Sequence, residues 1–272
     1  MGPAKPAPAE STTDPDWIPA DSFLDPSAAH LGQAIDWVSR SRSTDHRVVA
    51  ASIFSLGYSS LVVLPVVYSW AASRRVPDFG ADNVLVRISE GGGIRLGLKS
   101  DRWGVLASDS FASDARAIVV DSEADLVDWT RTRIIDAHLA HLVVGLRGVS
   151  RIGQRMVWGN ITSRLAAAVS LVAQLDPELV VKDTVDAFLA PSPSPMAGHV
   201  SLHWVGSGDT SVAVTRRSSC CVRFKLDNRG YCSDCKLVPL EDQLAAAERT
   251  AASRRATFDL FGASLARNSK SS

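Results

Sequence analysis

The chain has 272 residues, of which 46% are hydrophobic, enough for the core of one large domain or two small ones. Its 29 basic residues balance its 29 acidic ones, so the formal net charge is zero. A neutral chain has no overall field that attracts a polyanion, and we expect no nucleic-acid partner.

The N-terminus lacks the features of a secretory signal. Residues 1–16 are rich in Pro, Ala, Ser and Thr, contain three acids and are not followed directly by an apolar segment. This composition predicts a disordered tail. Because nothing in the chain indicates export, we expect a cytoplasmic protein whose thiols stay reduced.

A long uncharged stretch follows a first helix predicted at 26–40. Val48–Ser73 contains no charged residue and is long enough to span a bilayer. Its serines do not drive insertion, and Pro65 removes a helix hydrogen bond. We therefore expect two buried helices instead of a membrane span, at about 45–57 and 59–73. Peripheral association with a membrane stays open.

Alternation typical of strands begins after the uncharged stretch. Residues 83–89 and 94–98 are apolar runs on either side of Glu90-Gly-Gly-Gly93, a pattern that predicts a β-hairpin. The triple glycine does not predict a phosphate-binding loop, because its spacing matches neither nucleotide fingerprint and no helix follows at once. A third strand is predicted at 117–120.

The middle of the chain is predicted to be helical. A long helix should follow Asp121-Ser122 and end in a turn at Gly145–Ser150, with further helices at about 150–175 and 177–189. His138 and His141 lie three residues apart on the first of these helices. No companion carboxylate has the right spacing, so we expect a hydrogen-bonded core histidine and not a metal ligand.

The proline-rich segment Pro191–Pro195 marks the clearest boundary in the chain. Strand-like alternation returns at 199–204, 211–215 and 221–226, a turn is expected at 227–230, and a last helix at about 240–261. The sequence thus predicts an α+β protein: a mostly helical N-terminal part with a small antiparallel sheet, then a short β-rich region followed by a helix. The predicted divisions are the tail at 1–16, a domain at 17–190, a linker at 191–198 and a C-terminal region at 199–272.

All four cysteines fall within sixteen residues, as Cys220-Cys221 and Cys232-Ser-Asp-Cys235. Clustering indicates that they act together, since cysteines used only as small core residues would be scattered. Disulfides need an oxidising compartment. Zinc uses Cys-x-x-Cys pairs, but adjacent cysteines strain a small tetrahedral site. Four thiolates are the full ligand set of a [2Fe-2S] cluster. The residues alone leave these alternatives open and favour the iron–sulfur cluster.

The spacing Cys-Cys-x10-Cys-x2-Cys resembles the ferric-siderophore reductases of the FhuF type. The Arg-Arg before the first pair, the Arg-Phe after it and the segment Gly153–Asn160 are also similar to that family, with the last third of the chain matching best. The resemblance implies a [2Fe-2S] cluster and one-electron reduction of siderophore-bound Fe(III) in the cytoplasm. The implied cluster ligands are Cys220, Cys221, Cys232 and Cys235.

The same resemblance implies roles for other parts of the chain. The domain at 17–190 would bind substrate, the region at 199–272 would hold the cluster, and the helix residues Trp158 and Asn160 would lie beside it. The basic residues around the cysteines would offset the charge of the cluster or dock an acidic donor or an anionic chelate. The candidates for docking are Arg216, Arg217, Arg223 and Lys225.

The expected partners follow from what the chain lacks. It has no dinucleotide fingerprint or flavin motif, so electrons would come from a ferredoxin or a flavoprotein reductase. The expected substrate is a ferric siderophore of the hydroxamate type. The alternative function is a zinc-stabilised binding module without enzymatic activity, in which the cysteines only fold the C-terminal third.

Overall fold

The computed structural model describes residues 16–89, 93–173, 179–189, 194–206, 212–226 and 230–250. The helices are α1 (Ala20–Leu24), α2 (Ala29–Ser41), α3 (Arg47–Ser73), α4 (Glu123–Arg131), α5 (Ala140–Ser150), α6 (Gln154–Val172) and α7 (Val181–Leu189). A π-helical segment, Thr132–Leu139, joins α4 to α5, and residues 240–250 are also helical. The strands are β1 (Ile18–Pro19), β2 (Arg75–Pro77), β3 (Val84–Ile88), β4 (Ile94–Leu98), β5 (Trp103–Leu106), β6 (Ala117–Val120), β7 (Val200–Val205) and β8 (Val212–Arg217). The predicted α+β class is confirmed.

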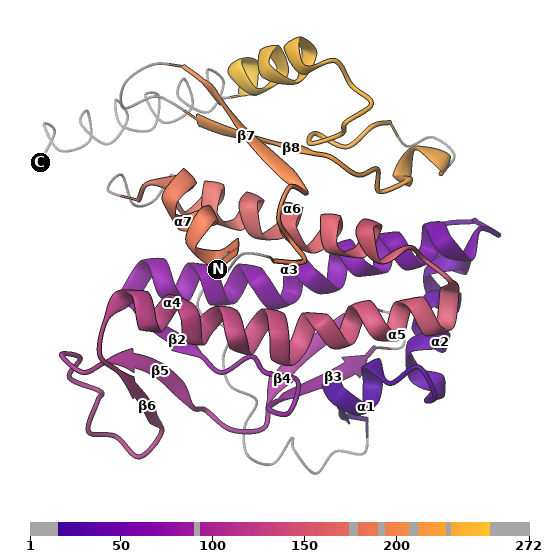
Figure 1. Cartoon of the computed structure of the whole chain (residues 1–272). Helices are drawn as coiled ribbons and strands as arrows, with labels where there is room; N and C mark the ends of the chain where they lie inside the picture. Colours follow the sequence, from indigo (N-terminus) through magenta and orange to yellow (C-terminus); the bar gives the residue numbers. More distant parts are fainter. Residues whose placement is uncertain are drawn as a thin grey trace, which may run out of the picture.

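Helix α3 runs through the centre of the molecule, beside α6 (Figure 1). Four of its valines, in two adjacent pairs one turn apart, are fully buried: Val62, Val63, Val66 and Val67. The prediction of two helices separated near Pro65 is wrong, because α3 is continuous through this proline. Pro65 lies on the partly exposed side of α3, and the residue whose carbonyl it leaves unpaired, Leu61, is exposed. Water can therefore replace the lost hydrogen bond at little cost.

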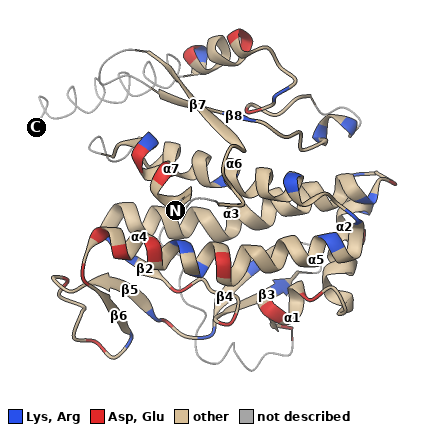
Figure 2. Cartoon of the chain, in the orientation of Figure 1, with Lys and Arg blue, Asp and Glu red and all other residues tan. Residues whose placement is uncertain are grey.

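By length and composition, α3 could cross a membrane, and Figure 2 shows no charged residue between its ends. In this fold 56% of its most apolar 18-residue window is buried. Core helices of soluble proteins have the same character, because a helix covered on most sides is apolar on most sides. Its packing against α2, α5 and α6 accounts for this composition without a bilayer.

The long middle helix begins where the sequence predicts and ends later. Ser122 caps α4 by accepting a hydrogen bond from the backbone N–H of Asp125. The predicted turn at Gly145–Ser150 is wrong, because α5 continues to Ser150 and ends where Arg151 adopts a left-handed conformation with φ 56°. A Cβ at Gly145 would lie 2.2 Å from the Leu24 carbonyl oxygen. Gly145 therefore allows α5 to approach α1 closely and does not form a turn.

His138, in the π-helical segment, is a core histidine, as predicted. Its Nδ1 lies 2.6 Å from the Phe79 carbonyl oxygen, and its Nε2 lies 2.8 Å from the Tyr58 hydroxyl. Because a carbonyl can only accept, Nδ1 carries the proton and Nε2 accepts from Tyr58. Burial lowers the pKa of His138 to about 4, although the Phe79 carbonyl opposes the shift. The imidazole is therefore neutral in the folded protein at neutral pH.

Two three-stranded sheets, with strand orders β1-β3-β4 and β2-β5-β6, pack against α3, and the second also packs against α4. The predicted hairpin is confirmed, since β3 pairs antiparallel with β4 up to Ile88 and Ile94, while residues 90–92 of its loop lie outside the described residues. The predicted strand at 117–120 is β6. It pairs parallel with β5, so the expectation of one small antiparallel sheet is corrected.

The C-terminal part is a β7–β8 hairpin that packs on α6 (Figure 1). The strand predicted at 221–226 is wrong: Val222 has φ 54°, and a 3₁₀ turn follows at Arg223–Lys225. The chain must turn there to bring Cys220 and Cys221 towards the core. Residues 227–229 of the predicted turn, 190–193 around the linker and the helix end beyond 250 lie outside the described residues. The domain boundaries stay a prediction.

We expect Gly145→Ala to lower the free energy of unfolding by about 2 kcal/mol, because the added methyl group must push α1 away. Gly57→Ala is the matched control. Gly57 is exposed in α3 and a Cβ there would meet nothing within 4 Å, so this change should raise stability by up to about 1 kcal/mol. Urea unfolding measures both. Equal effects of the two changes would contradict the close approach of α5 to α1.

We expect stability to fall as the pH drops from about 6.5 to about 4. The unfolded His138 takes up a proton in this window, whereas the folded one, with its pKa lowered to about 4, does not. The loss at pH 5 should be about 2 kcal/mol relative to pH 7. Urea unfolding at a series of pH values measures it. His138→Gln should lack this component, and an unchanged pH slope in that variant would assign the dependence to other groups.

Candidate functional site

Two loops bring the four cysteines together. Cys220 and Cys221 follow the end of β8 after two intervening residues, whereas Cys232 and Cys235 lie on either side of the turn at 233–234, before the helix at 240–250. The Sγ atoms of Cys221 and Cys232 are 3.5 Å apart. Cys221 and Cys235 are buried, while Cys220 and Cys232 are partly exposed. The site therefore has two buried thiols and two that reach towards the surface.

Backbone N–H groups donate to two of the sulfur atoms. Val222 N lies 3.3 Å from Cys220 Sγ, and Leu237 N lies 3.5 Å from Cys235 Sγ. The left-handed conformation of Val222 is unusual for a β-branched residue and is strained. Strain of this kind persists only where the surroundings hold it, and here it accompanies an N–H group directed at a sulfur atom.

The thiols influence one another's ionisation. The hydrogen bond from the Cys232 thiol lowers the pKa of Cys221 to about 6, and the same contact raises the pKa of Cys232. Burial raises the pKa of Cys220, and the charges of Cys221 and Cys235 raise it further. The thiols of Cys220 and Cys232 therefore each lie within electrostatic range of Cys221 and Cys235, and full ionisation of the four would require a positive partner.

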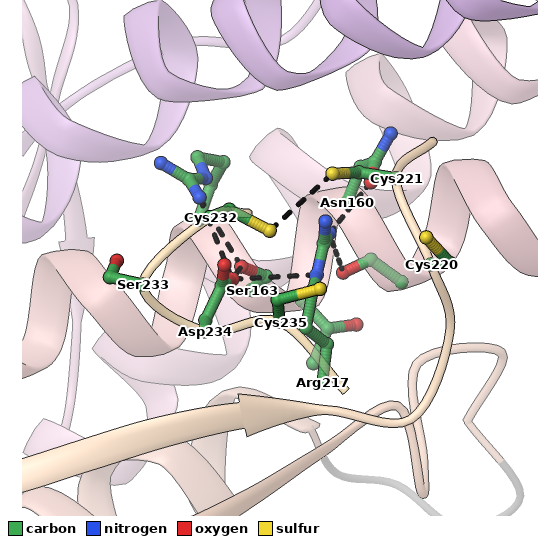
Figure 3. Close-up of polar contacts among 12 residues, drawn as sticks. Asn160, Ser163, Arg217, Cys220, Cys221, Cys232, Ser233, Asp234 and Cys235 are labelled. Carbon is green, nitrogen blue, oxygen red and sulfur yellow. Dashed lines mark hydrogen bonds and ion pairs between the residues drawn. The ribbon is translucent and has the colours of Figure 1, made fainter. Parts of the chain in front are cut away.

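A buried arginine lies between the two loops. The side chain of Arg217, at the end of β8, is only 1% exposed. Its Nη2 donates to Asn160 Oδ1 at 2.6 Å and to the Gly159 carbonyl oxygen at 3.1 Å. Figure 3 shows its guanidinium between the Cys220–Cys221 loop and the loop of Cys232 and Cys235.

Asn160 joins this arginine to α3. Its Nδ2 donates to Ser55 Oγ at 2.6 Å and to Ser52 Oγ at 3.1 Å. Ser52 Oγ in turn donates to the carbonyl oxygen of Cys221 at 2.7 Å. A chain of buried hydrogen bonds therefore connects the first cysteine pair to both central helices.

Asp234 makes the matching connection for the second cysteine pair. Its Oδ2 lies 3.4 Å from Arg217 Nε and accepts a hydrogen bond from Ser163 on α6. Burial alone would raise the pKa of Asp234, but the charge of Arg217 and the Ser163 hydroxyl outweigh it, and the pKa lies below its usual value. The carboxylate is thus ionised beside a cation, which is the form in which a buried acid is stable.

Gly159 allows the cysteine segment to lie against α6. A Cβ at this position would lie 2.0 Å from Ser219 Oγ, the residue before Cys220. A methyl group here would therefore force the Ser219 side chain to move, next to the first cysteine pair.

The four basic residues proposed for docking differ in their exposure and in their contacts. Arg217 is buried and bound inside the fold, so its docking assignment is wrong. Arg216 is also engaged, with its guanidinium donating to the Lys236 and Val238 carbonyls and to Gln243. Lys225 is exposed and Arg223 partly exposed on the turn after Cys221, so only these two remain candidates for docking.

Asn160 and Trp158, the two helix residues expected to lie beside the cluster, have different surroundings. Asn160 is in the hydrogen-bonded chain that holds Cys221, whereas Trp158 packs partly buried against the hydrophobic core. Sequence reasoning missed Ser52, Ser163 and Asp234. The position of Asp234 between two cysteines was a readable signal, but the serines carry none because their role depends on helix packing.

Two cavities lie away from the cysteines. One, of about 500 Å³, is lined by residues of α3, α4 and α7 that include Trp70. The other, of about 630 Å³, lies between α1 and the long middle helix. Ser52 and Trp70 are 18 residues apart on α3, about 27 Å along its axis. Neither cavity is a recess beside the thiols.

The FhuF-like family, described as ferric iron reductase FhuF-like transporters, matches residues 52–195, more than half of the chain. This chain belongs to the FhuF-like family. The matched region contains most of α3 and all of α6, including Ser52, Asn160 and Ser163, and ends before the first cysteine. The name of the family thus indicates a role in ferric iron reduction, and the cysteine motif is an additional observation outside the match.

Other comparisons gave only distant similarity. Two structures of the aerobactin synthetase IucA from a hypervirulent pathotype of Klebsiella pneumoniae, one of them ATP-bound, are 12% identical to this chain. They cover 64% and 65% of it, with TM-scores of 0.49 and 0.48, and the chain spans about a third (32%) of their length. At this level neither informs the fold or function of this chain. No curated protein matches.

The family name and the four clustered thiols raise the question of a bound iron–sulfur group. Within the described residues, no group of three or more Cys, His, Asp or Glu side chains has an arrangement that could hold a metal ion. Two observations fit a larger anionic group. Four thiols are the ligand set of a [2Fe-2S] cluster, and buried donors with no hydrogen-bond partner lie next to them, among them Arg217 Nη1 and Ser219 Oγ.

We expect Asn160→Ala to lower the free energy of unfolding by about 2–3 kcal/mol, because it removes a side-chain acceptor of the buried Arg217 and the amide that donates to two buried serine hydroxyls. Gln154→Ala is the matched control. This amide lies exposed on the same helix, with a single 3.4 Å contact from Arg147, and its loss should change stability by less than about 0.5 kcal/mol. Urea unfolding of both variants tests the contrast. Similar values would show that Asn160 does not support the site.

Proposed function

We propose that this protein is a ferric-siderophore reductase whose Cys220, Cys221, Cys232 and Cys235 hold a [2Fe-2S] cluster. The observation that carries the proposal is the convergence of all four cysteines in two loops around a buried cation, in a chain of the FhuF-like family. Four thiolates saturate such a cluster, so no further ligand is required. When bound, the cluster supplies the ability to accept and pass on one electron at a time.

Reduction of a ferric siderophore needs only that electron. Siderophore oxygens are hard ligands that bind Fe(III) tightly, and Fe(II), with one positive charge less, is held more weakly. One electron added to the substrate iron therefore loosens the complex, and the chelator leaves intact. No bond of the siderophore has to break, so the site needs no general base or nucleophile.

The exposed edge of the site is where we place the substrate. Cys220 and Cys232 reach the surface, and beside them the rings of Phe224 and Tyr231 lie 5.9 Å apart, both exposed. An open chelate can approach this edge without a deep pocket. Lys225 and Arg223 on the adjacent turn add positive charge for an anionic partner.

The proposed donor is a ferredoxin or a flavoprotein reductase, and the proposed compartment is the cytoplasm. The hydroxamate class is the proposed substrate, since its complexes with Fe(III) have exposed oxygen-rich faces. An acidic donor would use the same positive turn, which predicts that donor and chelate alternate at one edge.

Cys232→Ser should lose most of its iron and sulfide, and single-turnover reduction of a ferric trihydroxamate should fall at least tenfold. The measurement mixes dithionite-reduced, desalted protein with the chelate under argon and traps the Fe(II) with a coloured chelator. Ser233→Ala, an exposed neighbour, is the control and should match the wild type.

Retention of full iron content and rate by Cys232→Ser would refute the ligand assignment. A colourless wild type with one zinc per chain would refute the reductase and leave the cysteines as a scaffold.

A further inference from the structure

The buried guanidinium of Arg217 has more donors than the surrounding protein satisfies. Its Nη2 is paired with Asn160 and Gly159, but Nε and Nη1 are buried and have no hydrogen-bond partner, and Nε has only the ion pair at 3.4 Å with Asp234. Leaving a charged donor buried and unpaired is costly. Such an atom in a stable fold indicates an acceptor that is present when the protein works.

Several neighbouring unpaired groups can also donate, and one acceptor, Asp234 Oδ1, is unpaired as well. Ser218 Oγ and Ser219 Oγ, next to Cys220, are buried without hydrogen-bond partners, and so is Arg164 Nε on α6. The nearby carboxylate of Asp234 is shared by two guanidinium groups, since Arg164 Nη2 lies 3.6 Å from the same oxygen atom. One negative charge therefore faces two positive ones, and the balance beside the thiols is positive.

The position of Arg217 brings this surplus of positive charge close to the cysteines. The guanidinium lies between the two cysteine loops (Figure 3), and its charge acts on the thiols of Cys220 and Cys221. Its backbone N–H also donates to the carbonyl oxygen of Asp234, at 3.0 Å, which fixes β8 against the second loop. The cation can therefore move little relative to the sulfur atoms.

We propose that Arg217 is a positioning residue that sets the reduction potential of the group held by the four thiolates, with Asp234 acting in the opposite direction. This inference rests on the proposed [2Fe-2S] function. Addition of one electron makes the thiolate-bound centre more negative by one charge. A fixed cation stabilises the reduced form more than the oxidised one, so Arg217 raises the potential, and a fixed anion lowers it.

The experiment compares midpoint potentials in four variants of the full chain. Arg217→Gln should shift the midpoint to more negative values by at least the equivalent of a tenfold change in the ratio of reduced to oxidised protein, about 59 mV for one electron. Asp234→Asn, which preserves shape, should shift it to more positive values. Arg217→Lys retains the charge and should lie closer to the wild type than Arg217→Gln. Dye-mediated titration followed by electron paramagnetic resonance measures each value, with iron and sulfide determined per chain.

Arg216→Gln is the matched control. It removes the same charge one residue earlier on β8, where the guanidinium is satisfied by Gln243 and two carbonyls and successive side chains point to opposite faces. Its midpoint potential should differ from that of the wild type by less than a third of the shift caused by Arg217→Gln. Because Arg217 is buried, its effect should also persist at high salt, whereas an exposed charge would be screened.

The outcomes separate the two proposals. A wild type without iron and sulfide overturns the proposed function itself. A wild type with a full cluster and an unchanged midpoint in both Arg217→Gln and Asp234→Asn overturns only the role of Arg217. If Arg217→Gln does not fold, Asp234→Asn decides, because a shift to more negative values or no shift there contradicts the opposed charges.

Discussion

The buried contact between Arg217 and Asn160 is the interaction on which the rest of the site depends. It joins β8, which leads directly into the first cysteine pair, to α6, and through Ser52 and Ser55 to α3. Asp234 extends the same contact to the second pair. An unpaired buried arginine would be strongly destabilising, so the fold keeps these groups together or does not form this region at all. The position of the thiols is therefore set by hydrogen bonds to the two central helices, α3 and α6.

This arrangement places a sulfur-rich site at the edge of the molecule with its inner half buried. The buried cysteines and the cation behind them provide a low-dielectric setting in which charge matters, and the exposed cysteines provide access. A relay of single electrons needs both features. The cavities elsewhere in the fold have neither thiols nor a connection to Arg217. The aromatic pair and the positive turn beside the site form the surface on which we propose that a chelate and a donor protein bind in turn.

The sequence predicted what depends on local patterns. The α+β class, the β3–β4 hairpin, the start of a helix after Ser122 and the core role of His138 follow from spacing and residue type. Predictions that depend on tertiary contacts were wrong: Pro65 lies inside a helix because its free carbonyl faces the surface, and Gly145 permits a helix contact. Arg216 and Arg217 alternate on a strand, so one of the two had to face inward, but the pattern does not tell which. Ser52 and Ser163 gave no signal, because their partners lie far along the chain. The [2Fe-2S] ligands, the donor and the siderophore stay predictions.

The most direct test of the central claim is electron paramagnetic resonance of the anaerobically purified wild type, before and after dithionite, with iron and sulfide quantified. The account predicts a silent oxidised state, an S = 1/2 signal on reduction, and about two irons and two sulfides per chain, as a [2Fe-2S] cluster requires. A protein that contains zinc and gives no signal on reduction would contradict it, and the four cysteines would then have a purely structural role.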